Sequence, residues 1–147
     1  MSEPFDSEGW HVMLLRVPLH EVDLGMAVYH GNYYHLFQVA RDEFLRDAGF
    51  SYKRIMDLEL HLTIVETHCE YRKALHYDDL VQVHTRPSWM RTRSLGMEQK
   101  ITRRDDSGKA LLCTRLSLGL VCVTFQGLAT RIPKELAACL QKYLAPS

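Results

Sequence analysis

The longest amphipathic segment of the chain spans residues 33–48. Apolar side chains recur there at three- and four-residue intervals, as on one face of an α-helix, at Tyr33, Phe37, Ala40, Phe44 and Ala48. The polar face is predicted to hold Arg41, Asp42 and Arg46. Asn32 suits the N-cap, because its side-chain oxygen can accept from a first-turn N–H. Gly49 suits the position after the helix, because it adopts positive φ without a Cβ clash. We therefore predict a helix over residues 33–48 with one buried face.

Five other segments have the patterns of β-strands: residues 11–19, 60–72, 80–86, 95–101 and 110–125. Apolar and polar side chains alternate along most of them, as in strands with one buried face. The last segment is almost continuously apolar, so it predicts a strand buried on both faces. Pro133 suits the first turn of a closing helix that carries Leu136, Leu140 and Leu144 on one stripe.

The segment 60–72 changes character halfway along. In a regular strand, Leu62 and Ile64 project to one side, and Glu66 and His68 continue the same side. This face therefore turns from apolar to polar. We expect the strand to leave the core at that point and to carry polar side chains into a site.

The order of elements is a strand, the long helix, four strands and a short helix. Consecutive strands after a helix favour an antiparallel sheet with the helix packed across it, which is an α+β architecture. We expect a single domain over residues 11–147. Residues 1–10 are acidic and polar and predict a short disordered tail.

Composition narrows the classes of function. The 147 residues are 46% hydrophobic, enough for one packed core. Eighteen basic residues balance eighteen acidic ones, which argues against nucleic acid or an anionic membrane surface as the partner. No run approaches the ~20 apolar residues of a membrane span, and the N-terminus does not resemble a secretory signal. Four cysteines stand far apart without a C-x-x-C pair, which favours free thiols and a cytoplasmic location.

The candidate chemistry lies just before the long helix. Asp23 precedes a glycine-containing turn that leads into the helix. The first turn of a helix has unpaired N–H groups and a partial positive charge, so it favours an anion. A carboxylate beside such a turn is a candidate base, although an aspartate there is more often a cap or a turn former. Residue types and spacing alone leave both interpretations open.

The run D-L-G-M-A-V-Y-H-G-N-Y at residues 23–33 closely resembles the signature of the 4-hydroxybenzoyl-CoA thioesterase family. It is most similar to the branch of acyl-CoA thioesterases encoded with the Tol–Pal system. The resemblance implies the hotdog fold, in which a curved antiparallel sheet wraps around a long central helix. It also implies a homodimer or homotetramer with the active site at a subunit interface. Leu24 and Met26 are bulkier than the small residues usual after the acid, which changes the expected shape of the acyl pocket.

The same resemblance implies hydrolysis of an acyl-CoA to a free carboxylic acid and coenzyme A. Asp23 matches the family's catalytic carboxylate, which acts as nucleophile or as general base. The backbone N–H of His30, assisted by Gly31, matches the oxyanion donor, and Tyr29 and Asn32 shape this turn. A thiolate leaves readily, so one carboxylate and a polarising helix end can suffice. No metal or bound cofactor is implied, because coenzyme A is part of the substrate.

Four residues are candidates for substrate binding. Tyr33 is the member of the helical stripe expected to face the acyl group, and Glu66 is expected to be a second polar group in the site. Arg91 and Arg93, beside Trp89, are expected to hold coenzyme A phosphates, since guanidinium groups bind phosphate in bidentate fashion. Core packing for Tyr33 and ordinary surface charge for the arginines are the alternatives.

Other functions stay open at this point. A hotdog dehydratase would need a histidine and an acid facing each other, and His30 with Glu43 or Glu66 is the candidate pair. A non-catalytic acyl-CoA-binding protein would keep the fold without turnover. A metal site formed by His20, His30 and His35 is disfavoured, because their spacing matches no metal-binding motif.

Overall fold

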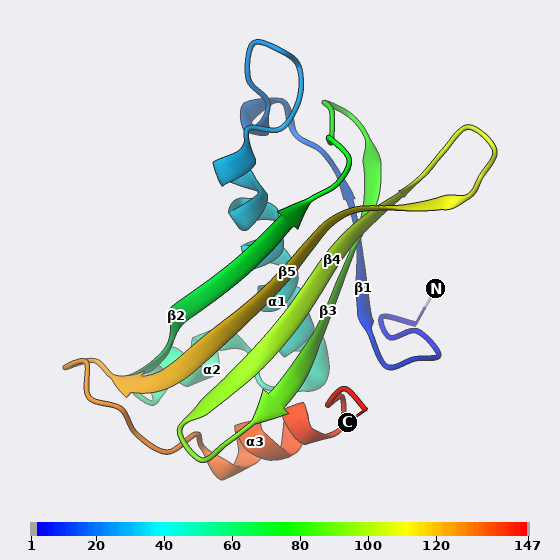
Figure 1. Cartoon of the computed structure of the whole chain (residues 1–147). Coiled ribbons are helices and arrows are strands. Elements are labelled where there is room, and N and C mark those ends of the chain that lie inside the picture. Colours follow the sequence, from blue (N-terminus) through cyan, green and yellow to red (C-terminus); the bar gives the residue numbers. More distant parts are fainter. Residues whose placement is uncertain (1–2, 147) are drawn as a thin grey trace.

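The computed structural model describes residues 3–146. Five strands form one antiparallel sheet in the order β1-β3-β4-β5-β2. They are β1 (His11–Arg16), β2 (Leu60–Tyr71), β3 (Leu80–Met90), β4 (Ser94–Arg104) and β5 (Ala110–Thr124). The long helix α1 (Tyr33–Ala48) lies across one face of the sheet, and α2 (Tyr52–Asp57) and α3 (Lys134–Gln141) lie near one end of it (Figure 1). This arrangement confirms the α+β architecture and the hotdog fold expected from the sequence.

Helix α1 begins and ends where the sequence predicts. Gly49 follows it with a φ of 101°, and its N–H donates to the carbonyls of Leu45 and Arg46. Phe37, Ala40 and Phe44 have no exposed surface. The predicted apolar stripe therefore forms the centre of the core against the sheet.

Arg41 is buried, although the sequence predicts it on the polar face of α1. Only 7% of the residue is exposed. Its guanidinium donates to Oε1 of Gln99 (2.9 Å) and to Oε1 of Gln38 (2.8 Å), and Gln99 donates in turn to the carbonyl of Phe37. Burial lowers the pKa of Arg41 from its ordinary value. The prediction was wrong because two amide side chains supply acceptors that helical periodicity cannot reveal.

Strand β2 contains a β-bulge that breaks its alternation. Ile64 pairs with Leu120 and Glu66 pairs with Gly119, so Val65 is an extra residue without a partner on β5. Ile64 lines the inner side with residues of α1, whereas Glu66 covers Gly119 on the outer face of the sheet. The expectation that Glu66 continues the face of Ile64 is therefore wrong.

Strand β5 is buried on both faces in two stretches only, at residues 113–114 and 118–120. Leu118, Gly119 and Leu120 are consecutive buried residues, as predicted. In the first half, Arg115 and Ser117 are exposed. The continuous apolar pattern thus describes only the part of the strand that neighbouring side chains cover from outside.

The ends of several elements differ from those predicted. Strand β1 ends at Arg16 rather than at residue 19, and β4 spans Ser94–Arg104 rather than residues 95–101. Strand β3 extends to Met90 rather than ending at residue 86, and α3 ends at Gln141, so Leu144 lies beyond it. Leu136 and Leu140 are fully buried, as the predicted stripe requires.

The segment before β1 packs on the domain. Phe5 stacks on Tyr143 with ring centroids 4.0 Å apart, and Trp10 is buried. The N–H of Val12 donates to the carbonyl of Pro4 (2.7 Å), so this segment covers part of the free edge of β1. For residues 3–10 these contacts differ from the disordered tail expected for residues 1–10; residues 1–2 lie outside the described part.

His84, on β3, makes the stability of the fold depend on pH. Its Nε2 lies 3.0 Å from Oγ1 of Thr102, and Trp10 contacts the ring edge-on. Burial, followed by the charge of Lys100, lowers the pKa of His84 to about 4. The unfolded chain therefore binds a proton below pH ~6.5 that the folded chain does not bind until about pH 4. The contribution of His84 to stability is fully present above this window and is lost as the pH falls through it.

We expect the free energy of unfolding to drop by up to about 3 kcal/mol through His84 between these two pH values. The measurement is denaturant unfolding of the wild type and of His84→Gln at a series of pH values. Glutamine keeps a polar group near Thr102 but cannot be protonated, so the variant should lose stability less steeply. Parallel curves for the two proteins would contradict the role of His84.

Candidate active site

Asp23 lies in a tight hairpin before α1. Val22 and Val28 form an antiparallel bridge, and the N–H of Asp23 donates to the carbonyl of Ala27 (3.0 Å). The Oδ1 atom of Asp23 accepts from the N–H of Gly25 (2.9 Å), and the residue is exposed. The carboxylate is thus oriented by its own turn and remains open to solvent and substrate.

The bulky residues after the acid do not crowd it. Leu24 is fully exposed, and Met26 is about half exposed with a φ of 66°. A Cβ at Gly25 would lie 3.3 Å from Oδ1 of Asp23, so the glycine keeps space beside the carboxylate. Leu24 and Met26 therefore add exposed apolar surface at the rim of the site.

The turn into α1 presents two free N–H groups. Residues His30–Asn32 form a short 3-10 helix, in which the N–H of Asn32 donates to the carbonyl of Tyr29 (2.8 Å). Within residues 3–146, the N–H groups of His30 and Gly31 donate to no protein acceptor. Free N–H groups at a helix start stabilise negative charge, so this turn is a candidate oxyanion site.

Asn32 does not cap α1 with its side chain, which corrects the prediction. Its Nδ2 donates instead to the carbonyl of Glu21 (3.1 Å). The N–H of Tyr29 donates to the same carbonyl (3.2 Å). Asn32 therefore leaves the first turn of the helix open and ties it to the segment that carries Asp23.

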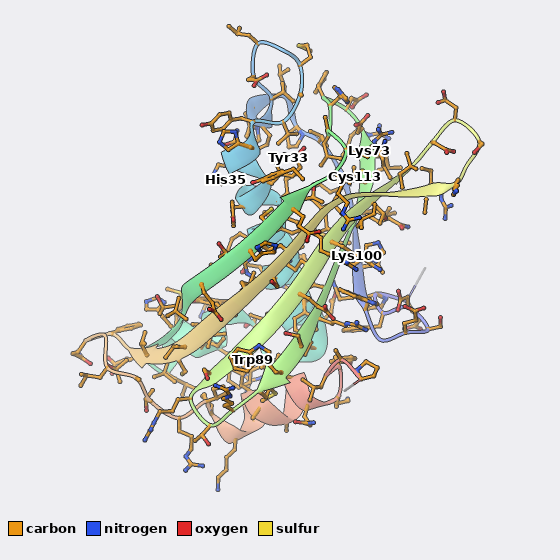
Figure 2. All side chains as sticks on the ribbon, viewed as in Figure 1. Tyr33, His35, Lys73, Trp89, Lys100 and Cys113 are labelled. Carbon is orange, nitrogen blue, oxygen red and sulfur yellow. The ribbon has the colours of Figure 1, made fainter. Side chains whose placement is uncertain are left out.

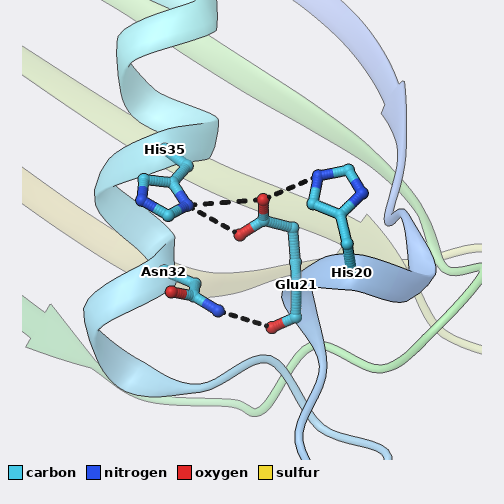
Figure 3. Close-up of polar contacts among 4 residues, drawn as sticks. All are labelled: His20, Glu21, Asn32 and His35. Carbon is cyan, nitrogen blue, oxygen red and sulfur yellow. Dashed lines mark hydrogen bonds and ion pairs between the residues drawn. The ribbon is translucent and has the colours of Figure 1, made fainter.

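The carboxylate of Glu21 fixes the same junction (Figure 3). Glu21 ends the short 3-10 helix Leu19–Glu21 and is only 4% exposed. Its Oε2 lies 3.0 Å from Nδ1 of His35, in the first turn of α1, and its Oε1 lies 2.9 Å from Nε2 of His20. A buried carboxylate is stable only with such partners. The cluster holds the beginning of α1 against the segment that precedes Asp23.

Tyr33 lies behind the turn rather than in it. The residue is 3% exposed, and its hydroxyl accepts a hydrogen bond from the N–H of Leu75 (3.1 Å). Burial raises the pKa of Tyr33 from its ordinary value. The structure therefore places Tyr33 in the core, where it supports the turn, and not on an acyl-binding surface of this chain.

Sequence reasoning missed two residues of this site, Glu21 and Tyr71. The Tyr71 hydroxyl donates to the carbonyl of His30 (2.7 Å), from a strand 41 positions further along the chain. Tyr71 lies within a strand that the sequence predicts, but no local pattern indicates which turn its side chain reaches. The position of Glu21, two residues before Asp23, was the available signal.

Glu66, Arg91 and Arg93 lie far from Asp23 within one chain. Glu66 faces the outer side of the sheet. Both arginines belong to the β3–β4 connection, and the Arg91 guanidinium lies 5.0 Å from the centroid of the Trp89 ring. Figure 2 shows Trp89 at the end of the sheet opposite to Tyr33 and His35. Within a single chain, Asp23 therefore lies near the turn at His30–Asn32 but not near Glu66, Arg91 or Arg93.

Residues 3–146 contain no group of three or more histidine, cysteine or acidic side chains arranged to hold a metal ion. Over the same residues, no helix has the length and apolar character needed to cross a membrane. The groups exposed at the turn include the carboxylate of Asp23, the backbone N–H groups of His30 and Gly31, and the aromatic side chain of Tyr29. Such a combination suits attack on an activated carbonyl, in which negative charge develops on oxygen.

The family model for the thioesterase-like superfamily matches residues 17–140. The chain belongs to this superfamily. A putative esterase of Aquifex aeolicus (strain VF5) is 33% identical over 126 residues, which is 86% of this chain and 94% of that protein. The acyl-CoA thioesterase YbgC of Haemophilus influenzae is 29% identical over 126 residues, which is 84% of this chain and 89% of that protein.

Solved structures match the fold of this chain. A hypothetical protein from Aquifex aeolicus, 29% identical, has a TM-score of 0.80 and is matched over 88% of this chain and 98% of that chain. A mutant 4-hydroxybenzoyl CoA thioesterase in complex with 4-hydroxybenzoyl CoA has a TM-score of 0.81 at 17% identity, over 89% of this chain and 98% of that chain. The second match supports the fold alone, and it is the hotdog fold expected from the sequence.

Proposed function

We propose that this chain is an acyl-CoA thioesterase, which hydrolyses an acyl-CoA to a carboxylic acid and coenzyme A. The observation that carries the proposal is the pair of free N–H groups on His30 and Gly31, next to the hairpin of Asp23. Membership of the thioesterase-like superfamily and the similarity to acyl-CoA thioesterases give the substrate class.

The reaction needs few groups. Asp23 either attacks the thioester carbon itself, which gives a mixed anhydride that water hydrolyses after coenzyme A has left, or takes a proton from a water molecule that attacks the carbon. The electron pair of the carbonyl moves to its oxygen, where the N–H groups of His30 and Gly31 stabilise the negative charge. The tetrahedral intermediate then expels coenzyme A as a thiolate, a good leaving group that requires little help from an acid.

The proposal includes a homodimer formed through the free edge of β2. Strand β2 has 12 residues and ends the sheet, whereas the segment at Pro4 covers part of the opposite edge at β1. Ile64 and Val65, in the middle of β2, are exposed. A long apolar edge strand is a template for pairing with a second chain. A homotetramer, built from two such dimers, is the larger assembly that the resemblance implies.

Exposed apolar side chains support this pairing because they gather at the two ends of β2. Beside its C-terminal end lie the hairpin and the β2–β3 connection, with Leu24, Met26, Tyr29, Tyr71 and Tyr77. Beside its N-terminal end lie the end of α2 and the end of β5, with Met56, Leu58, Phe125 and Leu128. Antiparallel pairing of two β2 strands about a two-fold axis would bring each set against the other set of the second copy.

The same two-fold arrangement would complete the site. A pocket of about 400 Å³, part of it open to solvent, lies between the middle of α1 and the first half of β2, with Gln38, Leu45, Leu62 and Ile64 among its lining residues. In the dimer this pocket would lie near the Asp23 hairpin of the second copy and would receive the acyl group. Arg91 and Arg93 lie near that end of the sheet, so they would be available for the phosphates of coenzyme A bound to the second copy.

Release of free thiol from a panel of acyl-CoAs tests the function. The panel holds short and long aliphatic and aromatic acyl groups. We expect turnover with at least one class, by a protein that light scattering shows to be a dimer or a tetramer. Binding of acyl-CoA without release of thiol would indicate a binding protein instead. Loss of water from a 3-hydroxyacyl-CoA without release of thiol would indicate a dehydratase.

A further inference from the structure

Each free N–H of the turn belongs to a peptide group whose carbonyl lies on the preceding residue. The N–H of His30 shares its peptide with the carbonyl of Tyr29, which accepts from the N–H of Asn32 (2.8 Å). The N–H of Gly31 shares its peptide with the carbonyl of His30, which accepts from the hydroxyl of Tyr71 (2.7 Å). One peptide is therefore held from within the turn, and the other is held by β2.

The hydroxyl of Tyr71 is well placed to hold this peptide. Its ring packs edge-on against Tyr33, with centroids 5.0 Å apart, and edge-on against His30 at 6.5 Å. Desolvation, together with the neighbouring Cys69, raises the pKa of Tyr71 from its ordinary value. The hydroxyl thus keeps its proton and acts as a donor to the His30 carbonyl.

A hydrogen bond to a carbonyl has two effects on the N–H of the same peptide. It fixes the plane of the peptide, and it polarises the amide so that the N–H becomes a stronger donor, by about 10–30% per bond. A donor fixed before the reaction stabilises a developing oxyanion without the cost of reorganisation. Gly31 has no side chain to shield this N–H, and a Cβ there would lie 3.1 Å from the Tyr29 ring.

We propose that Tyr71 is a positioning residue for thioester hydrolysis, whose hydroxyl holds the His30–Gly31 peptide so that the Gly31 N–H points at the thioester oxygen. This inference rests on the proposed function. It makes Gly31 a principal oxyanion donor beside His30, and it links the strength of that donor to β2, the strand whose free edge forms the proposed dimer.

The test is Tyr71→Phe, which removes the hydroxyl and keeps the ring against Tyr33 and His30. Removal of a whole oxyanion donor costs 10²–10³ in kcat, so loss of the bond that only orients the donor should lower kcat by about tenfold. We expect KM and the thermal midpoint to stay near those of the wild type, because the hydroxyl binds a backbone carbonyl of the turn and the ring stays in place.

The matched control is Tyr34→Phe. Tyr34 also joins α1 to β2 through a hydroxyl, at 3.2 Å from Oγ1 of Thr67, whereas the Tyr71 hydroxyl binds the carbonyl of His30 in the turn. The control should keep the wild-type kcat. An equal fall in kcat for both variants would overturn the proposal, because it would indicate that each hydroxyl only stabilises the packing of α1 against β2. A Tyr71→Phe variant with wild-type kcat would overturn it as well.

A spectroscopic measurement tests the same bond without turnover. Loss of the hydrogen bond to the His30 carbonyl should move the amide nitrogen resonance of Gly31 in Tyr71→Phe, while that of Gly25 stays in place. Unchanged Gly31 resonances would overturn the inference. If the wild type releases no thiol from any acyl-CoA, the proposed function fails instead, and this spectrum still decides whether Tyr71 holds the turn.

Discussion

Asp23→Asn is expected to lower kcat for thioester hydrolysis by roughly 10²- to 10⁴-fold, the range found when a general base is lost. Asparagine has nearly the same shape as aspartate, and its side-chain oxygen can still accept from the N–H of Gly25, which lies 2.9 Å from Oδ1 in the structure. The hairpin should therefore persist, and the loss of rate reports the missing negative charge. The measurement is release of free thiol at saturating acyl-CoA.

Binding and assembly need to be measured beside the rate. Asp23→Asn should bind acyl-CoA and form the same oligomer as the wild type. Glu43→Gln is the matched control, since Glu43 lies on α1, where some hotdog enzymes place their acid, and pairs with Arg46. It should keep the wild-type rate. An active Asp23→Asn together with an inactive Glu43→Gln would move the catalytic acid to the helix.

Val65→Lys is expected to separate the proposed dimer into monomers and to remove turnover with it. Val65 is 60% exposed in the middle of β2, so a lysine there does not disturb the fold of one chain. Near a two-fold axis, however, the two lysines would face each other. Juxtaposed like charges cost several kcal/mol, and a penalty of about 3 kcal/mol raises the dissociation constant by about 100-fold. Light scattering and thiol release over a dilution series measure both effects.

Leu14→Lys provides a control at the opposite edge of the sheet. Leu14 lies on β1 and is 61% exposed, nearly the same fraction as Val65. This variant should remain a dimer with the activity of the wild type. Dissociation of Leu14→Lys but not of Val65→Lys would place the interface at β1. Full activity of a monomeric Val65→Lys would show that one chain holds a complete site.

The sequence predicted the elements whose evidence is local. The apolar stripe from Tyr33 to Ala48 repeats within a few residues, and Gly49 ends the helix by its own conformational freedom. The helix and its end could therefore be predicted without knowing which distant residues they contact. The burial of Arg41 was not predicted, because one of its two hydrogen-bond acceptors, Gln99, lies on a strand 58 positions away. The other acceptor, Gln38, lies on its own helix. Burial of a polar side chain depends on such distant partners.

The features of the candidate site were likewise predicted where the evidence is local and missed where it is not. The short run that contains Asp23, His30 and Gly31 identified the hairpin and the turn, since all three residues lie within nine positions. The hydrogen bond of Tyr71 to that turn is a tertiary contact, and the partner of the Asn32 side chain depends on how the hairpin folds back. Local patterns therefore located the site but not the contacts that support it.

Because of the bulge at Val65, β2 contains one residue more than its pairing with β5 requires. Deletion of this one residue would close the bulge and leave the pairing of Ile64 with Leu120 and of Glu66 with Gly119 unchanged, so Tyr71 would still reach the turn. Insertion of one residue would instead move every following side chain of the strand to the opposite face, so that Tyr71 would point away from α1. One residue can therefore be removed at the centre of this strand without moving Tyr71, whereas one residue cannot be added there without turning Tyr71 to the other face.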